Sequence, residues 1–149
     1  MLADAPAGMG DGFGFAAQYA DEGVIVSLAE ASSLRDADRV TEELEKNGIE
    51  QIRLVLNRIN PELIEKKVLM TVDDCMDVLA IPILGIVPDD LAVTQCVTAG
   101  KFVEDTGVGA GRAFSNIAKR ISGTHIPMMD MDSNSKKSVF SRIKNLFSK

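Results

Sequence analysis

An aspartate followed by a proline and several glycines stands near the start of the chain, in the segment DAPAGMGDG at residues 4–12. In open α/β sheets, ligands bind beyond the carboxyl ends of the strands. An aspartate there can orient an attacking water or a Mg²⁺-bound water, and a glycine lets the backbone approach a phosphate closely. These residue types make Asp4 and Gly8 candidates for phosphate chemistry. The same letters also fit a plain tight turn rich in Pro and Gly.

Two further groups of polar residues follow apolar runs of the chain. Asn57, in the segment LNRIN, carries an amide with donors and an acceptor that can pair with the edge of a base. Pro88 and Asp89, in IVPDD, follow the next apolar run at the equivalent level and could form the rim of the same crevice. The alternative is structural: Asn57 caps a turn and Asp89 caps the next helix.

The elements that must position these residues are predicted from hydrophobic patterning. Three short runs rich in Val, Ile and Leu predict strands that are covered on both faces. They lie at residues 24–28, 52–59 and 82–88. The initial MLAD is interpreted as the end of a further strand, cut short by the initiator Met.

Helical patterns separate and follow the predicted strands. They cover residues 32–48, 61–69, 71–80, 91–100 and 108–123. Ser32 is predicted to cap the first of these helices, Asn47 and Gly48 to end it, and Thr71 to cap the third. On the first helix an apolar face is predicted from Leu34, Ala37, Val40, Thr41 and Leu44. Alternating strands and helices predict right-handed crossovers and a mostly parallel sheet, that is, a partial doubly wound α/β domain.

Composition sets limits on function. The 149 residues carry a net charge of −6, and five of the 16 basic residues fall within the last fourteen positions. The first 135 residues therefore carry 11 basic and 22 acidic side chains, which argues against nucleic-acid binding. The chain opens with no secretory signal pattern and contains no apolar run long enough to span a bilayer. We expect a cytoplasmic protein in which Cys75 and Cys96 are reduced and act as small apolar residues.

The basic end of the chain, KKSVFSRIKNLFSK, has an amphipathic pattern. On a helical wheel its apolar side chains occupy an arc of roughly 120°. These are Val139, Phe140, Ile143, Leu146 and Phe147, and the cations Lys137, Arg142, Lys144 and Lys149 lie beyond the edges of the arc. This pattern predicts a helix at residues 137–149 that lies in the interface of an anionic membrane. Packing of the apolar stripe on the body or on a second copy, and nucleic-acid binding, are the alternatives. We expect a body at 1–123 and a flexible linker at 124–136.

Four segments of the chain resemble segments of a known protein family and occur in the same order as in that family. They are DAPAGMGDGF, ADEGVIVSLAEASSLRDADRV, LVLNRINPELIEKKVLMTVDDCMDVLAIPILGIVPDD and the basic end. Together they resemble the MinD-type septum site-determining ATPases of the deviant Walker A, or ParA–MinD, family. The similarity runs from Asp4 almost to Lys149.

The resemblance assigns roles to the candidate residues. It implies that Asp4 acts near the γ-phosphate and holds Mg²⁺ through water, that Gly8 contacts a phosphate, and that ATP is the nucleotide. It implies an adenine pocket at Asn57, Pro88 and Asp89. It also implies a dimer and partner surface, whose candidates are Arg35, Asp36 and Asp38. The alternative for the last three is a solvated charged helix face.

One departure from the family limits what the chain is expected to do alone. The 149 residues contain no GxxxxGK[ST] phosphate loop, which holds phosphates with backbone N–H groups and a lysine. We therefore interpret the chain as the C-terminal part of such an ATPase and expect no ATP hydrolysis from it alone.

The resemblance also implies a cellular role. The family dimerises with ATP, binds the inner face of the cell membrane through its C-terminal helix, and recruits a MinC-like division inhibitor. A MinE-like regulator acts on it in some bacteria. Two alternatives remain: an adaptor that binds membrane and partner without ATP, and a ParA-like or flagellar-number ATPase relative.

Overall fold

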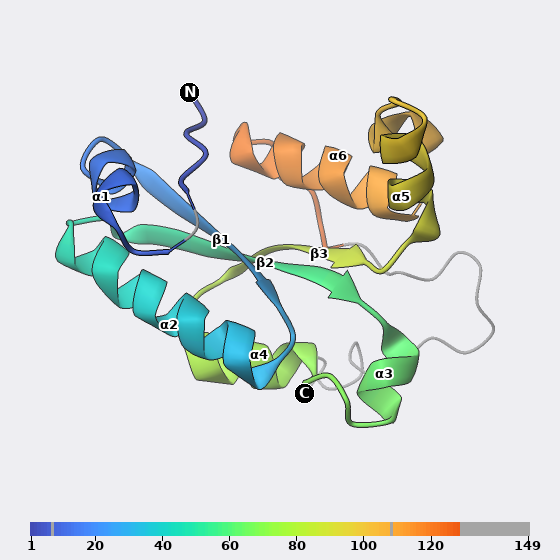
Figure 1. The fold of residues 1–149 in the computed structure, drawn as a ribbon, viewed down its shortest axis with the longest axis horizontal. Helices are drawn as coiled ribbons and strands as arrows, with labels where there is room; N and C mark the ends of the chain where they lie inside the picture. The colour runs from blue at the N-terminus through green and yellow to red at the C-terminus, as the bar shows by residue number, and fades with distance from the viewer. Residues whose placement is uncertain (7, 108, 129–149) are drawn as a thin grey trace. The chain divides into compact units, whose positions relative to one another are not determined.

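The computed structural model describes residues 1–6, 8–107 and 109–128, and they form two compact units, which Figure 1 shows. The first unit is Met1–Asp89 and the second begins at Asp90. The first contains α1 (Asp11–Ala17), β1 (Glu22–Leu28), α2 (Ala31–Lys46), β2 (Gln51–Ile59), α3 (Pro61–Glu65), α4 (Val72–Leu79) and β3 (Ile83–Pro88). The second contains α5 (Leu91–Thr98), the 3-10 turn η1 (Val103–Thr106) and α6 (Gly109–Ile121).

The sheet of the first unit has the order β1-β2-β3, and both strand pairs are parallel. The pairing of β1 with β2 is regular and runs from Glu22 opposite Gln51 to Leu28 opposite Asn57. Each crossover contains a helix, as parallel neighbours require. The predicted α/β class and the three predicted strands are therefore confirmed.

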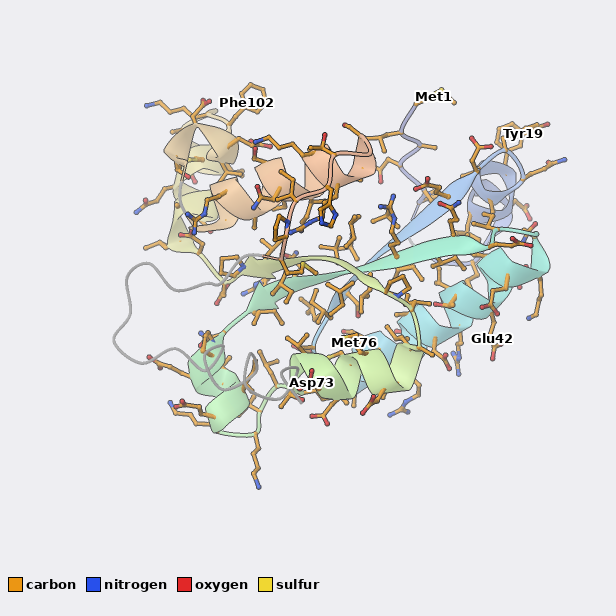
Figure 2. The ribbon with its side chains drawn as sticks, turned by 180° about the vertical axis from the view of Figure 1, so that it is seen from behind. Met1, Tyr19, Glu42, Asp73, Met76 and Phe102 are labelled. Atoms are coloured by element: carbon orange, nitrogen blue, oxygen red, sulfur yellow. The ribbon has the colours of Figure 1, made fainter. Side chains whose placement is uncertain are left out.

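The core of the first unit lies between the sheet and two helices, α2 and α4, on the same side of it (Figure 1). Alternate residues of β2 point into this core, and Ile52, Leu54 and Leu56 are at most 4% exposed. The predicted apolar face of α2 is confirmed, because Leu34, Ala37, Thr41 and Leu44 are buried and Val40 is half-buried. Glu42 projects from the opposite side of α2 (Figure 2).

Local capping explains where α4 begins and where α2 ends. The Thr71 hydroxyl accepts from the Asp74 N–H at 3.1 Å, and the Asp74 carboxylate accepts from the Thr71 N–H at 3.1 Å. This capping box confirms the predicted start of α4. Asn47 is the C-cap of α2 and Gly48 has φ 82°, as its stop signal predicts.

Three details of the predicted elements are wrong. Ser32 does not cap α2, because the helix begins at Ala31 after Glu30, whose side chain makes no cap hydrogen bond. The helix predicted at 61–69 ends at Glu65, since Lys67 adopts a left-handed conformation with φ 57° that no right-handed helix can continue. Residues 1–4 form no strand, because no described strand pairs with them.

Helix α1 was not predicted from the sequence, since it is short and contains two glycines. It contributes Phe13 and Ala17 to the core. Its other aromatic residues face outward: Phe15 and Tyr19 are each 68% exposed and pack edge to face, with ring centroids 5.4 Å apart. Figure 2 shows Tyr19 beside α1.

The second unit is held together by one carboxylate and by close helix packing. Asp90 caps α5 by accepting from the Ala92 N–H at 2.9 Å, and its other oxygen accepts from the Ala110 N–H of α6 at 3.0 Å. A Cβ on Gly111 would stand 2.2 Å from the Val103 carbonyl oxygen, so only glycine lets α6 approach η1 this closely. No helix within the described residues is long and apolar enough to cross a membrane.

Candidate functional site

The carboxyl end of β2 carries an extra residue. Leu56 pairs with Ile86 and Ile59 pairs with Pro88, so three steps along β2 match two along β3. The extra residue is accommodated where Arg58 adopts φ 55°, a left-handed conformation that is costly for a residue other than glycine. Such bulges re-aim side chains, and strained backbone of this kind clusters at functional sites.

The bulge brings together residues that are separate in the sequence. The Arg58 side chain donates from Nε to Asp89 Oδ1 at 3.3 Å, and the Arg58 N–H donates to Asn57 Oδ1 at 3.0 Å. The Asp89 N–H donates to the Ile59 carbonyl at 3.0 Å, which fixes the segment after β3 against β2. Asn57, Pro88 and Asp89 therefore meet at one edge of the sheet, around Arg58.

This edge has groups suited to a flat ligand with hydrogen-bonding edges. The guanidinium of Arg58 is planar and can stack on a ring, and the Asn57 amide retains its Nδ2 donors, for which no hydrogen bond to a described residue is recorded. Both members of the ion pair are accessible, with 66% of the Arg58 side chain and 42% of the Asp89 side chain exposed. Because an exposed pair contributes only about 0–1 kcal/mol, a ligand can replace it at small cost.

The structural alternatives for Asn57 and Asp89 have different outcomes. Asn57 does support the local turn, since its side chain accepts from the next N–H. Asp89 does not cap α5, because Asp90 performs that role. Asp90 carried no functional or structural prediction. Its signal in the sequence was its place directly before the apolar run that starts at Leu91.

The other predicted site residues lie elsewhere. Asp4 and Gly8 precede α1 in a segment without helix or strand, Gly8 has φ 86°, and no hydrogen bond or ion pair of the Asp4 side chain with a described residue is recorded. The candidates on α2 are exposed on its first two turns, at Arg35, Asp36 and Asp38. The predicted membrane residues lie outside the described residues: Lys137, Val139, Phe140, Arg142, Ile143, Lys144, Leu146 and Phe147.

Titratable groups near α4 serve structure. The hydrogen bond from the Thr71 hydroxyl, with that from its backbone N–H, holds the pKa of Asp74 below its ordinary value. Burial, together with the nearby Asp74 charge, raises the pKa of the Cys75 thiol to about 11. A thiol with this pKa is a poor nucleophile at neutral pH. Within the described ranges no three His, Cys, Asp or Glu side chains gather as metal ligands.

Comparison with known proteins gives consistent results at the level of sequence. The septum site-determining protein MinD of Synechocystis is 39% identical over 132 residues, which are 87% of this chain and 50% of that protein. MinD of Emiliania huxleyi is 39% identical over 149 residues, which are 98% of this chain and 55% of that protein. The chain thus spans about half the length of the curated relatives that it matches. No protein-family model matches the chain.

Solved structures give the same result for the fold. The MinD cell division protein of Aquifex aeolicus superimposes with a TM-score of 0.78 at 33% identity, over 85% of this chain and 54% of that one. The MinC:MinD complex of the same organism gives a TM-score of 0.79 at 34% identity, over 85% and 53%. A MinD of Pyrococcus horikoshii complexed with Mg-ADP shares the fold at 24% identity, with a TM-score of 0.69.

The fold and these similarities place the chain, as a partial α/β domain, in the class of P-loop NTPases that contains the MinD and ParA proteins. The predicted resemblance is confirmed. Within that class the chain is MinD-like: it matches septum site-determining MinD proteins over nearly its whole length and over about half of theirs.

Proposed function

We propose that this chain supplies the base-binding edge, the partner helix and the membrane anchor of a MinD-type cell-division ATPase. The observation that carries the proposal is the bulge at the end of β2, which gathers Asn57, Arg58 and Asp89 beside Pro88. The similarity to MinD proteins over nearly the whole chain supports the same role. Asp4 and Gly8 are proposed to act at the phosphates and, through water, at Mg²⁺, once a phosphate loop is present.

The base-binding edge is proposed to recognise adenine. Asn57 Nδ2 would donate to a ring nitrogen, Arg58 would stack on the purine, and Pro88 and Asp89 would form the rim. Saturation-transfer NMR with AMP, compared with GMP, tests this in the full chain. We expect a signal for AMP that Asn57→Ala abolishes and Asn47→Ala, a matched change at the exposed end of α2, retains. Equal signals from the two variants would contradict the assignment.

Membrane attachment is proposed to depend on residues 137–149. Burial of one large apolar side chain is worth about 1.5–3 kcal/mol and each cation near an anionic leaflet about 1 kcal/mol. Ordering a helix of this length costs much of that gain, so one tail binds weakly and reversibly. Two tails on one dimer would raise the apparent affinity for the membrane by a factor of roughly 10²–10⁴. Attachment to the inner face of the cell membrane would then depend on ATP-dependent dimerisation.

Vesicle flotation tests the anchor separately from the nucleotide. The full chain should float with vesicles of phosphatidylglycerol and phosphatidylethanolamine, whereas a variant that ends at residue 136 should not. Undiminished flotation of the shortened variant would refute the anchor. Flotation that is lost on deletion but unaffected by Asn57→Ala, with no nucleotide binding by the full chain, would instead favour the ATP-independent adaptor.

The partner surface is proposed to lie on the exposed side of α2. Arg35, Asp36 and Asp38 stand on the first two turns of this helix, and the similarity to the MinD of a MinC:MinD complex supports a MinC-like inhibitor as partner. A MinE-like regulator is a further candidate for the same surface. Charge reversal at Arg35 should weaken capture of a MinC protein, whereas reversal at Lys46, at the other end of α2, should not.

A further inference from the structure

Helix α5 exposes apolar side chains and carries no charge. None of its residues is buried, and its sequence, LAVTQCVT, contains no charged side chain. An exposed helix normally presents charged and polar residues to water on its outer face. Val97 of α5 is instead 74% exposed, and Phe102, in the turn that follows the helix, is 78% exposed. Exposed apolar surface of this kind marks a place where another element binds.

The turn after α5 brings these two side chains into one region. The Gly100 N–H donates to the Val97 carbonyl at 3.2 Å, and the Lys101 N–H donates to the Cys96 carbonyl at 2.9 Å. This Schellman motif folds the chain back on the last turn of α5, and Phe102 follows it directly. Figure 2 shows Phe102 at the outer side of this turn. We call Val97 and Phe102 the α5 patch.

Carboxylates border the α5 patch. The turn η1 begins directly after Phe102, and its acidic residues Glu104 and Asp105 are exposed. No ion pair of either side chain with a described residue is recorded, and the exposed Lys101 is the basic residue of this segment. Apolar side chains beside unpaired carboxylates are complementary to a segment that combines apolar residues with cations.

The chain itself contains such a segment. Residues 137–149, the tail, carry an apolar stripe bordered by lysines and an arginine, and no acidic residue falls among them. The tail therefore matches the α5 patch both in apolar character and in the sign of its charge.

The tail can reach the α5 patch from the end of α6. Helix α6 begins against η1, and its 13 residues span about 20 Å. Arg120, in its last turn, donates from Nε to the Ile126 carbonyl at 2.9 Å and from Nη2 to the Pro127 carbonyl at 2.7 Å. These bonds hold the following segment on the end of α6. Ten residues, 129–138, then lead to the stripe, and ten residues can span roughly 33–36 Å, which exceeds the length of α6.

We propose that, in the absence of a membrane, the apolar stripe of the tail packs on the α5 patch, with its cations beside Glu104 and Asp105. The membrane must then displace the tail from α5, so the patch restrains attachment. If two thirds of the molecules hold the tail in this way, one third is competent to bind, and the apparent Kd for vesicles is about threefold higher than that of a free tail. The regulatory part of this proposal rests on the membrane anchor proposed above.

Vesicle flotation tests the restraint. In phosphatidylglycerol and phosphatidylethanolamine vesicles, Val97→Ser combined with Phe102→Ser should reach half-maximal flotation at about threefold lower lipid concentration than the unchanged chain. Serine leaves the net charge unchanged, so the attraction to anionic lipid is not altered. The matched control combines Val68→Ser with Phe15→Ser, at a valine and a phenylalanine outside the patch that are 65% and 68% exposed. This control should float like the unchanged chain.

Hydrogen exchange without vesicles tests the docking itself. Amides of residues 95–102 should exchange about threefold faster in a variant that ends at residue 136 than in the full chain, whereas amides of α2 should not change. Equal exchange of these amides in the two chains, or equal flotation of the two double variants, would overturn the proposal. Protection of α5 that disappears on dilution would also overturn it, in favour of a second copy as the occupant. Protection of α5 by the tail, with no flotation of any variant, would support the docking and refute the anchor, so the two proposals fail separately.

Discussion

The left-handed conformation of Arg58 makes a prediction that separates stability from function. Relief of this conformation by glycine is worth about 1–2 kcal/mol, and the greater freedom of glycine in the unfolded chain offsets about 0.4–1 kcal/mol. Loss of the exposed pair with Asp89 offsets a further 0–1 kcal/mol. Together these terms give a change in the free energy of unfolding between about 1 kcal/mol of destabilisation and about 1.6 kcal/mol of stabilisation, so Arg58→Gly should destabilise the fold by no more than about 1 kcal/mol.

Lys67 provides the matched control, because it is also cationic, exposed and left-handed, with φ 57°, and has no recorded ion pair among the described residues. Lys67→Gly should stabilise the fold by about 0–1.6 kcal/mol. Urea denaturation followed by circular dichroism measures both variants, and in 1 M NaCl their difference should shrink as the Arg58 pair is screened. If Arg58→Gly destabilises by well over 1 kcal/mol while Lys67→Gly stabilises, the reasoning about strain is refuted. If Arg58→Gly folds normally and loses AMP binding, Arg58 serves the site and not the stability of the fold.

Three further outcomes follow from the described contacts. Gly111→Ala should unfold or strongly destabilise the second unit, because its Cβ meets a carbonyl oxygen at 2.2 Å, and unchanged exchange of α6 amides would contradict this packing. Because the pKa of Asp74 is lowered in the fold, its stabilisation is present above the ordinary value of 3.8 and is lost as the pH falls through the lowered pKa. Asp74→Ala should thus cost about 0.5–1 kcal/mol at pH 7 and progressively less as the pH falls through the lowered pKa, as urea titrations would measure, unlike Asp77→Ala. Iodoacetamide should label Cys96 in the native chain and Cys75, whose pKa is about 11, only after unfolding, as mass spectrometry would show.

Much of the fold was predictable because its signals are local. Each strand is a short run of Val, Ile and Leu, and Thr71, Asn47 and Gly48 end or begin helices through contacts within four residues. The features that were missed depend on distant contacts. Residues 1–4 were predicted as a strand, yet a strand requires a neighbour to pair with. Lys67 ends α3 in a conformation that its residue type disfavours.

The residues of the candidate site also divide into those that local signals predict and those that depend on distant contacts. That Asn57, Pro88 and Asp89 meet at one edge of the sheet was predictable, because the carboxyl ends of neighbouring parallel strands lie at the same edge. Arg58 was not, since its role comes from a one-residue mismatch between β2 and β3 that neither strand reveals alone. The separate roles of Asp89 and Asp90 also depend on partners far apart in sequence, Arg58 for the first and Ala110 for the second.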